Sequence, residues 1–267
     1  MVLGVVVLEW RAETSRGLVR PENEDSWLVS NLARAGKHMW LAMVADGIGG
    51  HDGGEIASSL AVNSVSECFS QSLFALFVDK PEDALRSAVL YANSKILESS
   101  ARGSGVPGMG TTLTCTMIDE KRRKAYFGHI GDSRAYVISG GSIMRITDDH
   151  SLSGELLKNG TITEEDAMRH PGRNVLTAAL GAEEEIRIAT YERDLLPHDI
   201  VLLCTDGLTG LVRAEEIFEA AMEYGKDGAA QKLVELANSR GGYDNITVVL
   251  LWPLAAETKG ALRGEVG

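Results

Sequence analysis

The hydrophobic and polar positions along the chain follow two periodicities, one typical of buried strands and one typical of amphipathic helices. A period near 3.6 predicts helices over Glu55–Phe77, Pro81–Ser100, Ala214–Tyr224 and Ala229–Ser239. Short apolar or β-branched runs bounded by glycine and aspartate predict strands at Val2–Leu8, Trp40–Ala45, Thr111–Ile118, Ala125–His129, Ala135–Ser139, Ile200–Cys204 and Ile246–Trp252.

The order of these elements favours an α+β fold. A helix pair and then a run of strands with a hairpin-like Gly140-Gly141 turn interrupt any regular alternation of strand and helix. Such an order predicts antiparallel sheet covered by helices. We expect one folded catalytic domain over residues 1–254 and a polar tail over residues 255–267, with a glycine-rich link at 102–108.

Composition removes several function classes. The formal net charge is −12, which argues against binding to a nucleic-acid backbone, because that affinity comes from Lys and Arg. The opening apolar run is too short to span a membrane and lacks a preceding basic region, so we expect no membrane association and a cytoplasmic location. Cys68, Cys115 and Cys204 show no paired spacing, which predicts neither a disulfide framework nor a zinc site.

Acidic residues stand at the ends of the predicted strands. Asp46 and Asp206 each end an apolar run and are followed by glycine. Each position alone is typical of a turn, since Asp-Gly is a common turn dipeptide. The remaining acidic residues in such places are Glu24 and Asp25 before an apolar stretch, Asp132 between two strands, and Asp244 before the last strand.

The acidic set together points to a metal site. If the strands pair, the carboxylates converge, and two unit charges about 4 Å apart repel by ~4 kcal/mol even at an effective dielectric near 20. A cation is then needed between them. Oxygen ligands without a histidine pair favour Mg²⁺ or Mn²⁺ over Zn²⁺, and Gly47 could add its carbonyl. A carboxylate shared by two ions would lower the pKa of bound water, which indicates hydrolysis.

Arg20 stands a few residues before Glu24 and Asp25. Its planar guanidinium could bind a phosphate held by the ions. The alternative is a solvated surface arginine, and we favour phosphate binding because of the neighbouring acidic pair.

Eight motifs in order resemble the signatures of the protein phosphatase 2C family, the metal-dependent PPM phosphatases, in its compact bacterial form. The resemblance implies a four-layer α-β-β-α sandwich of two antiparallel β-sheets flanked by helices, hydrolysis of phosphoserine and phosphothreonine in proteins, and a Mn²⁺ or Mg²⁺ pair at one end. We expect a monomer that acts on substrates of Ser/Thr kinases. The motifs are GLVRPENED, ADGIGGHDGGEIAS, GMGTTLT, HIGDSRAYVI, TDDHSL, NGTITEEDAMRHPGRNVLTAALG, CTDGLTG and YDNITVV.

The resemblance also implies roles for single residues. Arg20 would bind the substrate phosphate, and the segment Ser151–Asn174 would be a mobile flap that shapes substrate access. The implied metal ligands are Asp46 bridging two ions, the Gly47 carbonyl, Asp206 and Asp244 in the first site, Glu24 and Asp25 in the second, and Asp132, with Asp206, for a third, weaker ion.

Three positions depart from the family pattern. Ser15 replaces a common aspartate two residues before Gly17, which weakens support for the network around the site. Ile48 stands where eukaryotic relatives carry a histidine proposed as general acid, so another group must protonate the leaving oxygen. Gly210 stands where many relatives have an acidic third-ion ligand, so the implied third site has one carboxylate fewer.

Other catalytic patterns fit poorly. A cysteine phosphatase needs arginine six positions after the nucleophile, where Cys115 has Lys121 and Cys204 has Gly210. Ser133 would need a histidine base, and we interpret it as a turn residue. The GSGVPG run at 103–108 precedes a strand instead of following one, the reverse of a dinucleotide site.

Two biological alternatives remain open at the sequence level. The chain could serve one regulatory phosphoprotein in a partner-switching circuit, or it could be a catalytically silent scaffold that binds phosphoproteins. The retained acidic set argues against the silent scaffold. His51, beside the Asp46 loop, is left outside the core assignment.

Overall fold

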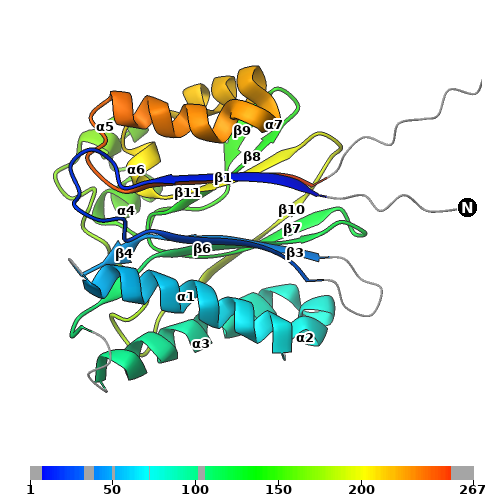
Figure 1. Cartoon of the computed structure of the whole chain (residues 1–267), viewed down its shortest axis with the longest axis vertical. Helices are drawn as coiled ribbons and strands as arrows, with labels where there is room; N and C mark the ends of the chain where they lie inside the picture. Colours follow the sequence, from blue (N-terminus) through cyan, green and yellow to red (C-terminus); the bar gives the residue numbers. More distant parts are fainter. Residues whose placement is uncertain (1–7, 33–38, 50–51, 72, 102–105, 254–267) are drawn as a thin grey trace, which may run out of the picture.

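The computed structural model describes residues 8–32, 39–49, 52–71, 73–101 and 106–253. Two five-stranded antiparallel sheets face each other, and helices cover both outer faces (Figure 1). The predicted four-layer sandwich is confirmed. No helix within the described ranges combines the length and the apolar character that crossing a membrane requires.

The first sheet joins strands from both ends of the chain. Helix α7 (Ala214–Ser239) packs on β1 and β12, and the short α6 (Asp206–Thr209) follows β11. In spatial order, its strands are β1 (Glu9–Ser15), β12 (Ile246–Trp252), β11 (Ile200–Cys204), β8 (Arg134–Ser139) and β9 (Ser142–Arg145).

The second sheet carries the other helical layer, formed by α1 (Asp52–Gln71), α2 (Leu73–Asp79) and α3 (Pro81–Ala101). A separate two-stranded ladder of β4 (Gly47–Ile48) and β5 (Gly110–Thr111) lies beside it, and α4 (Leu152–Lys158) and α5 (Glu164–Arg169) follow β9. The strand order of the second sheet is β10 (Ala189–Asp194), β7 (Lys124–Ile130), β6 (Leu113–Asp119), β3 (Met39–Ala45) and β2 (Ser26–Asn31).

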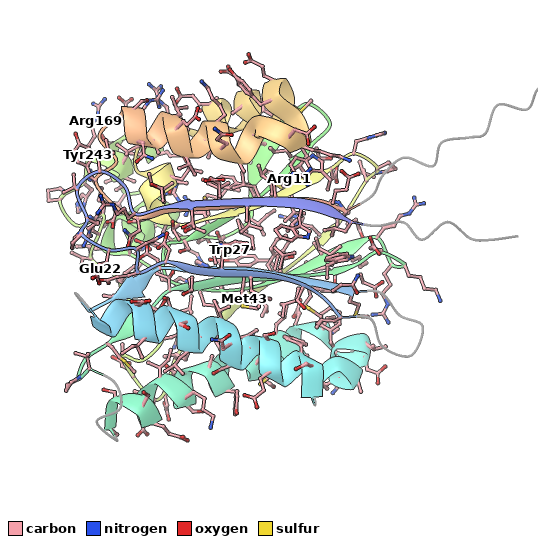
Figure 2. All side chains as sticks on the ribbon, viewed as in Figure 1. Arg11, Glu22, Trp27, Met43, Arg169 and Tyr243 are labelled. Carbon is pink, nitrogen blue, oxygen red and sulfur yellow. The ribbon has the colours of Figure 1, made fainter. Side chains whose placement is uncertain are left out.

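The central strands are buried on both faces, which explains their continuous apolar sequences. In β3, Leu41 and Met43 pack toward α1 and α3, whereas Ala42 and Val44 pack between the sheets. Figure 2 shows Met43 on the helical side of its sheet and Trp27 in the space between the two sheets.

The structure also shows which elements the pattern missed. The strands β1, β2, β9 and β10 were not predicted, and all four lie at sheet edges. An edge strand exposes one side and often one face to water, so its sequence stays polar. Within the predicted Val2–Leu8 strand only Leu8 is described, and it precedes β1.

One predicted helix differs from the structure and two agree with it. The single helix predicted over Glu55–Phe77 is two helices, α1 and α2. The two helices predicted after Ala214 both lie in α7, and the non-helical backbone of Gly225 (φ 55°, ψ −152°) separates them as predicted. The predicted tail over 255–267 and residues 102–105 of the glycine-rich link lie outside the described residues.

Antiparallel pairing gathers the acidic strand ends at one end of the sandwich. Ser15 pairs with Ile246 and Cys204 pairs with Val248, so the residues after Cys204 and before Ile246 lie together. Ser26 pairs with Ala45, which brings the preceding acidic pair beside Asp46. Helices α4 and α6 lie at the same end (Figure 1).

Candidate metal centre

Asp46 is held by its backbone at the end of β3. Its N–H donates to Thr112 Oγ1 at 3.0 Å. Its carbonyl accepts from the Thr112 N–H at 2.9 Å and from Thr111 Oγ1 at 2.8 Å. These three bonds fix where the side chain begins, and the paired short strands β4 and β5 hold Gly47 directly behind it.

The Asp46 carboxyl lies among other carboxylates. Burial raises its pKa well above the usual value, and the negative charges of Asp25, Asp206 and Asp132 raise it further. Burial and the negative charge of Asp244 raise the pKa of Asp206 as well. The predicted convergence of these strand-end acids is therefore present in the structure.

Asp25 joins this carboxylate cluster from the loop before β2. Its Oδ2 accepts from Thr247 Oγ1 at 2.6 Å and from Thr205 Oγ1 at 2.9 Å. Burial raises the pKa of Asp25 to about 7 despite these two donors. Its Oδ1 is buried without a hydrogen-bond partner, and so is Oδ1 of Asp206. Buried carboxylate oxygens without donors are the groups that a hard cation would satisfy.

Glu24 lies against a glycine that leaves room for it. A Cβ at position 54 would overlap Glu24 Oε2, and a Cβ at Gly47 would meet the Gly54 and Glu24 carbonyl oxygens. The Glu24 N–H donates to Asn245 Oδ1 at 2.8 Å. The two glycines thus allow the Glu24 carboxylate and the Asp46 loop to approach each other closely.

Asp244 and Arg20 form an ion pair at the edge of the pocket. Arg20 Nη2 lies 2.8 Å from Asp244 Oδ2. The hydrogen bond to Asp244 raises the pKa of Arg20, and the charges of Asp46 and Glu24 add to it. The guanidinium therefore faces the acidic group, as the phosphate-binding prediction requires, and about half of its side-chain surface stays accessible to a ligand.

Asp132 is a further buried acid of this cluster. It is buried, and burial together with the charge of Asp206 raises its pKa well above the usual value. Asp132, Asp206 and Asp244 line one pocket that extends under α4 and α5. Gly210 ends α6 with its N–H donating to the Asp206 carbonyl at 2.7 Å, and it brings no side chain to that pocket.

The acidic side chains are close together without being arranged around a point. Among the described residues, no three acidic, histidine or cysteine side chains stand in a geometry that could hold an ion. The fit to divalent cations therefore depends on the oxygen-only donor set, the two partnerless buried oxygens and the raised pKa values. Each of these marks negative charge that the protein's own donors leave uncompensated.

The structure adds residues that sequence reasoning missed. Asn245 donates from Nδ2 to the Arg16 and Glu22 carbonyls at 3.0 and 2.8 Å, and so ties the loop that carries Arg20 to the last strand. Thr205 and Thr247 hold Asp25. Asn245 and Thr205 directly neighbour a predicted acid in sequence, and this adjacency was the only signal that could have identified them. Thr247, inside the last strand, gave no such signal.

The rival nucleophiles are poorly placed. Cys115 and Cys204 are fully buried, and burial raises the pKa of each thiol to about 12, so neither forms a thiolate near neutral pH. Ser133 is buried with its hydroxyl 2.7 Å from Thr112 Oγ1.

Ser15 accepts the Gly17 N–H at 3.1 Å and shapes a turn. His51 lies outside the described residues.

Residues 19–249 match the family model described as protein phosphatase 2C. Among curated proteins, the serine/threonine phosphatase Stp of Listeria welshimeri is 34% identical over 241 residues, covering 89% of this chain and 93% of the relative. The serine/threonine protein phosphatase PstP of Mycobacterium tuberculosis is 36% identical over 92% of this chain, which spans 45% of that longer protein.

Solved structures agree with these matches. The crystal structure of the M. tuberculosis phosphatase PstP/Ppp superposes with a TM-score of 0.80 at 34% identity, covering 94% of this chain and all of that one. The PstP catalytic domain in complex with 2 manganese ions gives a TM-score of 0.78 at 33% identity, covering 92% of this chain and 98% of that one.

Proposed function

Because the chain belongs to the protein phosphatase 2C family and is a serine/threonine phosphatase, we propose that its strand-end acidic cluster holds two Mn²⁺ or Mg²⁺ ions for hydrolysis of phosphoserine and phosphothreonine in proteins. The observation that carries this proposal is the set of buried carboxylates with raised pKa values around Asp46. The manganese-bound relative supports the choice of metal.

We assign the ligands as the resemblance to the family implies. Asp46 lies between the other acids and is the candidate shared ligand, with the Gly47 carbonyl beside it. Asp206 and Asp244 would serve one ion. Glu24 and Asp25, which enter from the opposite loop, would serve the other, directly or through water. Asp132 would contribute, with Asp206, to a third and weaker site, where Gly210 supplies no carboxylate.

The chain's own residues divide the remaining work. Arg20 presents its guanidinium at the pocket edge and would bind the phosphate oxygens by charge-assisted hydrogen bonds. The Thr205 and Thr247 hydroxyls keep the Asp25 carboxylate oriented by donating to one of its oxygens. When bound, divalent ions would neutralise the phosphate charge and lower the pKa of a water molecule toward neutrality.

Replacing Asp46 tests the assignment. We expect Asp46→Ala to lower kcat for p-nitrophenyl phosphate by about 10³-fold or more, because metal-ion catalysis contributes several kcal/mol of charge stabilisation. Wild-type turnover should require Mn²⁺ or Mg²⁺ and disappear in EDTA. Ser142→Ala, at the exposed first residue of β9, serves as the control. Wild-type activity in Asp46→Ala would refute the assignment.

The same assay separates the silent scaffold from the enzyme. A protein that binds Mn²⁺ and releases no phosphate from any substrate would favour the scaffold. The dedicated regulatory circuit, the cytoplasmic location and the monomeric state stay predictions. A phosphoproteome of a deletion strain would distinguish one substrate from many.

A further inference from the structure

Three exposed apolar side chains stand beside the candidate phosphate site. Leu18, Val19 and Tyr243 keep 70%, 63% and 62% of their surface exposed. Val19 directly precedes Arg20, and Tyr243 directly precedes Asp244. We call these three residues the apolar rim. Single exposed apolar residues need no explanation, but a group next to a ligand site marks an interaction surface.

The backbone under the apolar rim is fixed to the pocket. The Leu18 N–H donates to the Gly242 carbonyl at 2.8 Å, and Arg20 pairs with Asp244 at 2.8 Å. Gly17 has φ +76°, and a Cβ there would overlap the Asp244 carbonyl oxygen. Hydrogen bonds and an ion pair thus join two segments that lie more than two hundred residues apart in the sequence. Each segment carries one charged site residue and an exposed apolar neighbour.

One residue of the apolar rim reaches the acidic pocket. Tyr243 lines the same pocket as Asp132, Asp206 and Asp244. Figure 2 shows Tyr243 at the end of the sandwich that also carries Arg169 of α5 and Glu22, whereas Arg11 lies toward the other end. A ligand whose phosphate binds Arg20 therefore has exposed apolar side chains beside it, Val19 next to Arg20 and Tyr243 next to Asp244.

We propose that the apolar rim binds an apolar side chain of the phosphoprotein substrate, within about two residues of the phosphorylated serine or threonine. An extended peptide advances roughly 3.3–3.6 Å per residue, so a chain that places its phosphate at Arg20 lays its nearest neighbours over Leu18, Val19 and Tyr243. This inference deepens the proposed function and depends on the phosphate site being at Arg20.

Paired phosphothreonine peptides provide the test. Two sets of peptides differ only by leucine or serine at one position within two residues of the phosphothreonine. We expect wild-type kcat/KM to be about tenfold higher for the best-placed leucine peptide, since burying one apolar group typically changes specificity by 10-fold or more. In the triple variant Leu18→Ser/Val19→Ser/Tyr243→Ser, the ratio of kcat/KM for the leucine peptide to kcat/KM for the serine peptide should fall toward one. A general loss of activity cancels in this ratio.

Met222→Ser provides the matched control, because Met222 is 59% exposed on α7 and lies outside the apolar rim. Its peptide ratio should equal that of the wild type. If the protein shows no turnover, the affinities of the leucine and serine peptides for the same variants can be compared by fluorescence polarisation. Turnover of p-nitrophenyl phosphate tests the proposed function separately.

A wild-type ratio near one at every position would overturn the inference, and so would a ratio that the triple variant preserves. A triple variant that changes sedimentation with protein concentration but keeps the ratio would assign the surface to a second copy of the chain instead. Loss of p-nitrophenyl phosphate turnover in the wild type would count against the proposed function alone.

Discussion

At the scale of single residues, the acidic cluster is shaped by uncharged groups around it. Threonine hydroxyls and the Asn245 amide hold Asp25 and Glu24 in place. Arg20 is the cation that the structure pairs with Asp244 at the pocket edge. The hydroxyl donors orient the Asp25 carboxylate without cancelling its charge, so they leave it able to bind a cation. The Asn245 amide oxygen instead accepts the Glu24 backbone N–H and fixes the main chain there.

Substitution of Arg20 should weaken substrate binding more than metal binding. We expect Arg20→Ala to raise KM for a phosphopeptide by about 10- to 100-fold, because hydrogen bonds to charged groups contribute roughly 1.5–3 kcal/mol. Mn²⁺ affinity, measured by isothermal titration calorimetry, should not fall. A selective loss of Mn²⁺ affinity with unchanged KM would show that Arg20 does something else.

Gly54 should tolerate no side chain. The Cβ of Gly54→Ala would overlap the Glu24 carboxylate, so Glu24 must move away from the Asp46 loop. We expect the Mn²⁺ concentration for half-maximal activity to rise at least tenfold. Gly228→Ala in α7 is the control, since its nearest contact is a Tyr224 side-chain atom at 3.3 Å and its backbone is helical. Equal Mn²⁺ dependence in both variants would contradict the assignment of Glu24.

At the scale of elements, a buried histidine connects two strands to the segment before α4. His129 of β7 bonds through its ring nitrogens with Thr114 Oγ1 of β6 and with the Asp148 carbonyl, both at 2.9 Å. Burial, together with the charge of the neighbouring His150, lowers the pKa of His129 to about 3. Folding therefore keeps this ring neutral.

His129 should make stability depend on pH. Its folded pKa is depressed below the unfolded value near 6.5, so the unfolded state binds the extra proton between about pH 6.5 and 3. Stability is therefore present above pH 6.5 and falls as the pH drops, by about 1.4 kcal/mol per pH unit for one proton. Urea unfolding at pH 7 and pH 5 should show a smaller loss for His129→Gln than for the wild type. Equal losses would show that another group dominates.

At the scale of the whole molecule, the candidate site joins both sheets. Asp46 follows a strand of the second sheet, whereas Asp206 and Asp244 flank strands of the first. Ions bound among them would hold the two layers together at one end. Their binding free energy would then add to the free energy of unfolding, because the unfolded chain has no such site.

Manganese should raise the thermal stability of the protein. At a free Mn²⁺ concentration about 100 times Kd, binding contributes about 2.7 kcal/mol to stability. Differential scanning fluorimetry should show a higher Tm with Mn²⁺, reversed by EDTA. The increase should be reduced in Asp46→Ala. A Tm that ignores Mn²⁺ at millimolar concentration would mean that the pocket does not bind it.

The sequence by itself determined the buried elements and the identity of the acids. Central strands such as β3 and β12 are apolar on both faces, because a strand buried on both faces needs apolar residues at nearly every position. The strand-end positions of Asp46 and Asp206 were readable for the same local reason, and the ordered motifs indicated the family that the matches confirm.

Only the tertiary structure decided which distant groups meet. The edge strands β1, β2, β9 and β10, the tie from Asn245 to Glu24 and the Arg20–Asp244 pair all depend on strand register between remote segments. Local hydrophobic periodicity indicates which residues are buried but not which strands pair, because the same apolar strand could pair with several others. The register is set by packing the two sheets and their helices together, and that packing brings the acids to the same end of the sandwich.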